Sequence, residues 1–387
     1  MTPDPELEEI RAGYARFITS CRTGDGYSLT PGAAESPYAL CFAIFGWQLL
    51  RQDELLTTQR QLWDQKLRTG LADFRSYRRL ACRSLAHDKA YLQLLTFTLS
   101  SLAILGTLCV NPLEDLICEL LPSDLSRELA ESGVFAGLPR SGNHAMFIAI
   151  LLCHAQKYLR YDTTAQLDQW VQLHRTARNQ FGFWGKSRGI THLQFQNGYH
   201  QYEILKYLGI GDWDWEVPAD SVASLADEDG QFAPYPGGSG CYNYDAVFMI
   251  TGSQSAVDRH RRLLAHTKAT LRKKQNPDGG FCESQFIRPR NRNNCVSALR
   301  HIVRGRGPAR WERLRHCLSL QRSKYDRVKN HWNEAAYDWS SSDLWNSWFH
   351  MLTLARIESA FNPSEALRWG FINYPGIGYH SSLRGAG

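Results

Sequence analysis

The chain has 387 residues, is 43% hydrophobic and 21% charged, and carries a formal net charge of +6. This composition excludes a disordered or fibrous protein and provides for a large buried core. No linker rich in Pro, Gly and Ser separates two hydrophobic patterns, so we expect a single domain over residues 1–387.

Helical periodicity recurs along the chain, whereas strand patterns are nearly absent, which predicts an all-α fold. Leu92–Asn111 carries no charge and is long enough to span a bilayer. Its Gln and Thr residues favour a packed inner helix instead, and attachment to a membrane surface stays open. The expected helices are Leu7–Thr19, Ala39–Leu50, Tyr91–Cys109, His144–Leu159, Asp245–Thr251 and Leu344–Ile357.

The ten cysteines are scattered without any CxxC pair. Reduced thiols in this pattern are typical of cytosolic proteins. The opening MTPDPELEEI lacks the basic and apolar regions of a signal peptide. We therefore expect a cytoplasmic protein, and we expect no cofactor and no bound metal.

A weak repeat consists of a Gly-aromatic turn, a polar loop and an aromatic-led apolar helix. Glycine gives the turn its backbone freedom, and the aromatic side chain fills the space between neighbouring hairpins. Such repeats indicate stacked helical hairpins, and their irregular spacing favours a closed ring over an open solenoid. The copies read DGYSLTPGAAESPYALCFAIF, FGFWGKSRGITHLQFQNGYHQYEILKYL, DGQFAPYPGGSGCYNYDAVFMI and QNPDGGFCES.

QNPDGGF, and the DGQF turn that precedes CYNYDA, resemble the QxxDGGF turns of the terpenoid cyclase and protein prenyltransferase superfamily. The resemblance covers mainly residues 225–360. It implies an α/α toroid, a ring of helical hairpins around an aromatic-lined central cavity. It also implies an enzyme that handles a large apolar substrate, such as an isoprenoid.

In zinc prenyltransferases the metal ligands lie in two segments that resemble residues 239–244 and 343–346 here. Ser239 stands where the resemblance requires a carboxylate, and Asn346 where it requires an imidazole. Cys241 alone would then have to hold the ion, whereas a catalytic zinc needs about three protein ligands. We therefore expect no zinc at Cys241, which remains a catalytic candidate.

Cyclases started by protonation place an acid at the beginning of an inner helix, and the resemblance gives this role to Asp245. Desolvation would keep such an acid protonated and reactive. Capping of its own helix is the alternative role for Asp245. Aromatic side chains expected to shape the pocket, or simply to pack the core, are Tyr242, Tyr244, Trp345 and Trp348.

Polar side chains are concentrated around Gly198, where we expect a helix to begin. Residues three and four apart share one face of such a helix. They form either a catalytic lining, with Tyr199 and His200 moving protons, or a buried hydrogen-bonded network. Cys282, directly after the DGGF turn, is either a nucleophilic thiol at a helix start or a small packed side chain. The remaining candidates for substrate binding are Asn197, Glu203 and His144.

Two other functions remain open. A carbohydrate-active toroid, lyase or hydrolase, would use His144, Tyr199 and His200 as proton-transfer groups. A non-catalytic scaffold would bind an anionic partner through residues 286–330, which hold thirteen Lys/Arg and two acidic residues. A solvated helical face is the plainer interpretation of that basic segment. No aromatic residues alternate with its arginines, so we find no specific nucleic-acid signal.

Overall fold

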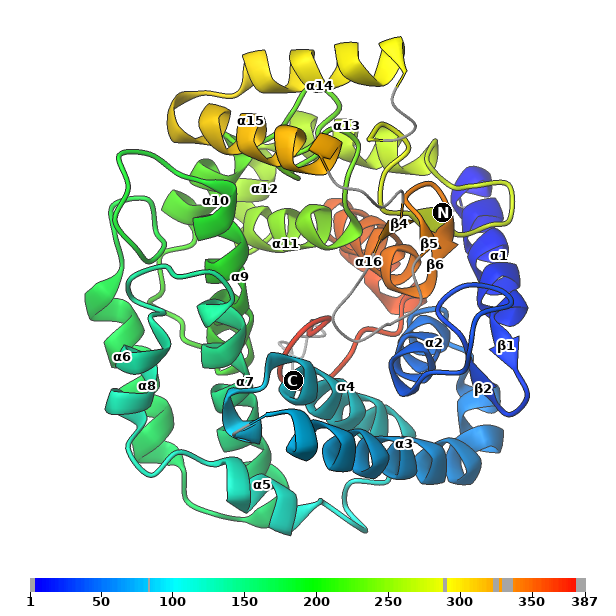
Figure 1. The fold of residues 1–387 in the computed structure, drawn as a ribbon, viewed down its shortest axis with the longest axis vertical. Helices are drawn as coiled ribbons and strands as arrows, with labels where there is room; N and C mark the ends of the chain where they lie inside the picture. Colours follow the sequence, from blue (N-terminus) through cyan, green and yellow to red (C-terminus); the bar gives the residue numbers. More distant parts are fainter. Residues whose placement is uncertain (1–3, 83, 288–290, 323–326, 329–336, 381–387) are drawn as a thin grey trace. The chain divides into compact units, whose positions relative to one another are not determined.

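The computed structural model describes residues 4–82, 84–287, 291–322, 327–328 and 337–380. Helices dominate this part of the chain (Figure 1), so the all-α prediction is confirmed. The strands found among the described residues are two residues long and pair antiparallel as β1–β2, β3–β6 and β4–β5.

The chain divides into two compact units, each assembled from segments distant in sequence. Unit 1 comprises residues 1–51, 187–195 and 214–370, and unit 2 comprises residues 52–186, 196–213 and 371–387. Each unit is described by itself below. The single-domain toroid over residues 1–387 therefore stays a prediction.

Unit 1 is built around α11 (Gly240–Ile250) and α16 (Leu344–Phe361), which pack against each other, with α2 (Pro37–Leu49) also against α16. Its other elements are α1 (Pro5–Ser20), β1 (Arg22–Thr23), β2 (Gly26–Tyr27), α10 (Glu216–Ala223), α12 (Gln254–Arg259), α13 (Arg261–Arg272), β3 (Phe281–Cys282), α14 (Arg292–Arg304), α15 (Gly307–Arg322), β4 (Arg327–Val328), β5 (Tyr337–Asp338), β6 (Ser342–Asp343) and η3 (Pro363–Arg368).

Aromatic packing fixes α16 against α2. The Phe42 ring lies 5.2 Å from the Trp345 ring and 5.9 Å from the Trp348 ring, measured between centroids. Trp348 is 1% exposed, which makes it a core residue. Such large buried rings contribute several kcal/mol of apolar burial. The helices expected at Ala39–Leu50 and Leu344–Ile357 are confirmed.

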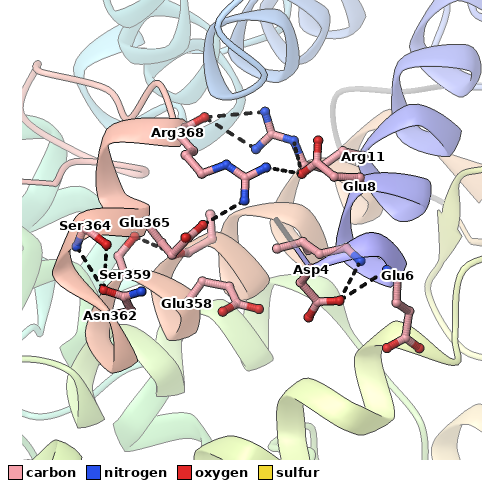
Figure 2. Close-up of polar contacts among 12 residues, drawn as sticks. Asp4, Glu6, Glu8, Arg11, Glu358, Ser359, Asn362, Ser364, Glu365 and Arg368 are labelled. Carbon is pink, nitrogen blue, oxygen red and sulfur yellow. Dashed lines mark hydrogen bonds and ion pairs between the residues drawn. The ribbon is translucent and has the colours of Figure 1, made fainter. Parts of the chain in front are cut away.

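An ion pair and hydrogen bonds connect α1 to η3, which follows α16 in the chain (Figure 2). Arg368 pairs with Glu8 and with Glu365, and the Arg11 guanidinium donates to the Arg368 carbonyl at 3.4 Å. Exposed pairs of this kind each contribute little to stability, but a network restrains its members together. Asn362, which ends α16, accepts from the Ser364 amide at 3.2 Å and so starts η3.

Unit 2 packs α3 (Asp53–Ala81) on α4 (Lys89–Leu105), and α4 on α7 (Ser141–His154). The expected inner helix is confirmed, because residues 90–102 of α4 are buried. No helix among the described residues is long and apolar enough to cross a membrane. The remaining elements are η1 (Leu85–His87), α5 (Glu114–Leu120), α6 (Leu125–Ser132), η2 (Ala155–Leu159) and α8 (Thr164–Ala177).

α9 (His192–Tyr207) begins six residues earlier than the sequence led us to expect. In unit 1, the Glu312 carboxylate accepts from the His192 amide at 2.6 Å and from the Leu193 amide at 2.8 Å. A carboxylate of α15 therefore caps the start of α9, and the sequence around that start does not predict this cap. In unit 2, Gly198 lies inside α9 and not at its start. Glycine fits this position because a Cβ there would meet the Phe183 ring.

Candidate active site

Two side chains at the start of α16 cap both α16 and α11 in unit 1. Asp343 is the N-cap of α16, and its Oδ1 accepts from the Asn346 amide at 2.7 Å. The Oδ1 of Asn346 in turn accepts from the Gly240 amide at 3.1 Å, at the start of α11. Backbone N–H groups at the start of a helix have no partner within the helix. Here two side chains of one turn accept hydrogen bonds from such groups in two helices.

The β3–β6 pair places Glu283 beside this turn. Phe281 pairs with Asp343 and Cys282 with Ser342, and Glu283 follows directly after β3. The Nδ2 of Asn346 donates to Glu283 Oε2 at 3.1 Å and to Asp343 Oδ2 at 2.8 Å. Because both oxygens contact one nitrogen, they lie within roughly 6 Å of each other. The Tyr235 hydroxyl donates to Glu283 Oε1.

Both carboxyl groups are electrostatically unusual. Burial raises the pKa of Asp343 to about 7, against the hydrogen bonds from Asn346 and with the added repulsion of Glu283. Burial also raises the pKa of Glu283, while hydrogen bonds from Tyr235 and Asn346 oppose this. Neighbouring carboxyl groups whose pKa values are raised hold a proton to higher pH than free carboxyl groups do.

Access distinguishes the two acids. Asp343 is 0% exposed, whereas Glu283 is half-buried and keeps solvent-accessible surface. Cys241, Tyr242 and Trp345 are also half-buried and belong to the first turns of α11 and α16. Glu283 is therefore the residue of the pair that keeps accessible surface, although both of its carboxyl oxygens are hydrogen-bonded. The half-buried aromatic side chains lie at the starts of α11 and α16.

The two cysteine candidates lie near the carboxyl pair but lack nucleophilic character. Cys241 Sγ lies 3.1 Å from Ser239 Oγ, and burial raises its thiol pKa well above the ordinary value. Cys282 lies in β3 and not at a helix start, and burial raises its pKa to about 12. Of the two roles left open for Cys282, the structure fits the small packed side chain, and both thiols stay protonated at neutral pH.

Asp245 neither caps its helix nor belongs to the bridged pair. It lies within α11, whose N-cap is Ser239, and it is 2% exposed. Tyr244 is 0% exposed and packs its ring 5.7 Å from that of Phe349. Raised carboxyl pKa values are found at Glu283 and Asp343.

The polar candidates of α9 belong to unit 2, where they connect α9 to α7. Asn143 Nδ2 contacts His200 Nε2 at 2.8 Å, and burial lowers the pKa of His200 to about 3. The Tyr199 ring lies 5.0 Å from the His200 ring, and Glu203 accepts from the Gly378 amide at 3.3 Å. His200 is a buried imidazole of lowered pKa whose Nδ1 has no hydrogen-bond partner among the described residues.

Asn197 and His144 have different surroundings from His200. Asn197 braces the chain before α7, donating to the Leu138 carbonyl at 2.9 Å and accepting from the Arg140 amide at 3.2 Å. His144 contacts Glu128 at 2.6 Å. The structure therefore does not join His144 to the Tyr199 and His200 pair.

Sequence reasoning passed over the carboxylate of Glu283. The residue adjoins Cys282, which drew attention to the thiol, and its partner Asp343 lies sixty residues further along the chain. The signal available was the DGGF turn, after which β3 runs antiparallel to β6. Only that non-local pairing places the two acids together.

Comparison with known proteins gives a likeness to glycosidases. No family model and no curated protein matches the chain. Similar solved structures include a glycosidase variant in complex with glucose and two further glycosidase variants, each with a TM-score of 0.48 and 11% or 12% identity. Each match covers 92% of this chain and 99% of the other.

This result corrects the expected function. The matched structures are glycosidases, which overturns the terpenoid-cyclase-like function expected from the sequence. Identity this low leaves the chemistry of the chain to be argued from its own site.

Proposed function

We propose that the chain is a carbohydrate-active enzyme that hydrolyses a glycosidic bond, with Glu283 as the proton donor. The observation that carries this proposal is the Asn346 bridge, which holds two carboxyl groups with raised pKa values beside each other. A glycosidic oxygen is a poor leaving group until it receives a proton, and a carboxylic acid with a raised pKa supplies that proton near neutral pH.

Asp343 acts through Glu283 as a positioning residue. It is fully buried and engaged by Asn346, so it does not serve as a second, substrate-facing carboxylate. Its role is to fix the side-chain amide of Asn346, which in turn positions the carboxyl group of Glu283. Half-buried Tyr242 and Trp345 offer aromatic faces against which a sugar ring packs, as in other ligand pockets. The ten free thiols fit a reducing, cytoplasmic setting.

The proposal is tested with the full chain and a panel of α- and β-linked aryl glycosides and oligosaccharides. Wild-type protein is expected to release the leaving group or a new reducing end, and Glu283→Gln to lower kcat by about 100-fold or more. Glu54→Gln, at an exposed position of α3, is the matched control and should leave kcat unchanged. An unsaturated uronate product would show elimination instead of hydrolysis, and no turnover across the panel would refute the proposal.

A further inference from the structure

Two imidazoles and one carboxylate converge in unit 2, remote in sequence from the carboxyl pair. His87 ends η1, Glu128 lies on α6 and His144 lies on α7. His144 Nε2 is 2.6 Å, and His87 Nδ1 3.7 Å, from the same oxygen, Glu128 Oε1. One candidate ligand atom from each residue lies within 4.8 Å of the other two.

The Glu128 carboxylate makes its ion-pair contacts with the two histidines. Within the described part of the chain, Glu128 forms no ion pair with a lysine or arginine, whereas Arg127 beside it pairs with Glu131 at 2.8 Å. Glu128 and His144 are half-buried, whereas His87 is exposed. The His87 and His144 rings meet edge to face, with centroids 5.5 Å apart.

The cluster opens onto a pocket of about 370 Å³, which Glu128 and His144 line. Asp124, Glu119 and Glu131 add carboxylates to its wall. A site with three protein ligands and free coordination positions toward a pocket is the arrangement of catalytic or ligand-binding metal centres.

We propose that His87, Glu128 and His144 bind a divalent first-row transition metal ion, with Zn²⁺ as the reference ion. Nitrogen and oxygen ligands of this kind suit Zn²⁺ at bond lengths of about 2.0–2.2 Å. Binding replaces the hydrogen bond between His144 and Glu128 by two metal bonds, and water or an oxygen ligand from the pocket completes the coordination. The expectation of no bound metal stays a prediction, which the titration below tests.

The test uses the metal-free full chain, titrated with Co²⁺ and followed by visible absorption, then displaced by Zn²⁺. One equivalent is expected to bind without a thiolate-to-cobalt charge-transfer band, which separates this site from the ten cysteines. His87→Ala and Glu128→Gln should each weaken binding at least about tenfold.

His260→Ala is the matched control, since His260 contacts Asp220 at 2.7 Å in a histidine–carboxylate pair of similar geometry. It should leave the affinity unchanged. His87 is exposed, so its substitution tests the site without disturbing the core. Absence of stoichiometric binding, or equal binding by wild type, His87→Ala and Glu128→Gln, would overturn the proposal.

A separate surface of unit 1 has a different character. α14 and α15 are consecutive helices that lie side by side (Figure 1), and their outer positions combine exposed apolar and cationic side chains. On α14, Val296, Leu299 and Val303 lie within one helical face, and Leu299 is 61% exposed. On α15, Trp311 and Leu318 are seven residues apart, and Trp311 is 66% exposed.

Unneutralised arginines share these faces. Among the described residues, none of Arg292, Arg300, Arg306 and Arg315 forms an ion pair. The opposite faces of the helices are the ones that pack, through Ala298, Ile302 and Leu320, on a core cluster. A second copy of this surface would repel it, and a nucleic acid would leave the apolar residues exposed to water. Parts of the basic segment, residues 288–290, 323–326 and 329–330, lie outside the described residues.

We infer that the outer face of α14 and α15 docks on an anionic lipid surface, inserting its apolar residues between the acyl chains while the arginines meet the headgroups. The full chain is expected to sediment with phosphatidylcholine vesicles that contain phosphatidylglycerol and not with phosphatidylcholine alone. Leu299→Ser with Trp311→Ser, and separately Arg300→Gln with Arg315→Gln, should each lower the bound fraction severalfold. The control, Arg60→Gln with Arg262→Gln at exposed positions, should not.

Two outcomes would overturn this inference. One is the failure of the wild-type chain to sediment with the anionic vesicles. The other is binding that the arginine variant loses but the Leu299 and Trp311 variant keeps, because a soluble polyanion would then be the partner and the apolar positions would have no role.

Discussion

Glu283 and Asp343 share a single hydrogen-bond donor, the Nδ2 of Asn346, at 3.1 Å and 2.8 Å. One amide thus restrains two acids whose pKa values are both raised by burial. The same side chain also caps α11 through its Oδ1, so the geometry of the acids depends on the junction of two core helices. The proton-donating role proposed for Glu283 follows from this junction.

Replacing Asn346 by Ala should move the pH dependence of catalysis. The hydrogen bonds from Asn346 lower the pKa of both carboxyl groups, so their loss raises both values. An acid that must be protonated then stays active to higher pH, and the alkaline limb of the kcat profile should shift upward. An unchanged or downward shift would contradict the bridge, and the lost cap should lower the free energy of unfolding by about 1–3 kcal/mol.

Asp343→Asn should change how stability depends on pH. The pKa of Asp343 is about 7 in the folded chain and near 3.9 in an unfolded one. The unfolded state therefore releases the proton first, and the wild type should lose a few kcal/mol as pH rises from about 4 to about 7. The variant lacks this titration. Urea unfolding across that range should give a flatter curve for the variant, and parallel curves would refute the assignment.

Cys241→Ser should retain the activity of the wild type. The thiol is protonated at neutral pH because burial raises its pKa, so it offers no nucleophile. Steady-state assays of the variant and the rate of alkylation by iodoacetamide measure this directly. Slow alkylation with full activity is expected, whereas a loss comparable to that of Glu283→Gln would assign Cys241 a catalytic role.

Gly142→Ala should destabilise unit 2. A Cβ at this position of α7 would lie 1.9 Å from the Asn197 carbonyl oxygen of α9, so the backbones must separate. Overpacking of this kind costs about 1–3 kcal/mol in the free energy of unfolding. Gly211→Ala is the matched control, because a Cβ there meets nothing within 4 Å. Equal unfolding midpoints for the two variants would contradict the close helix packing.

Local patterns were sufficient to predict the long apolar helices. Mostly apolar segments such as Leu344–Ile357 bury nearly every side chain, so each helical turn contains the apolar residues from which a helix is predicted. The start of α9 could not be predicted in this way, because its cap is a carboxylate from α15. The prediction that the helix begins at Gly198 was also wrong, because this glycine allows close packing against Phe183 within α9.

The candidate site was only half predicted, for a related reason. Cys241, Tyr242, Cys282 and Trp345 were chosen from local motifs and do lie near the carboxyl pair. The pair itself arises from strand pairing between segments sixty residues apart, which periodicity does not report. His87, Glu128 and His144 likewise come from three elements, with no ligand spacing in the sequence.

The most direct test of the central claim compares Glu283→Gln with the wild type on two substrates of one sugar, a glycosyl fluoride and an unactivated disaccharide. Fluoride leaves without protonation, whereas the sugar alcohol needs a proton from the enzyme. If Glu283 is the proton donor, the variant should lose about 100-fold or more in kcat on the disaccharide and much less on the fluoride. An equal loss on both substrates, or no loss on the disaccharide, would contradict it.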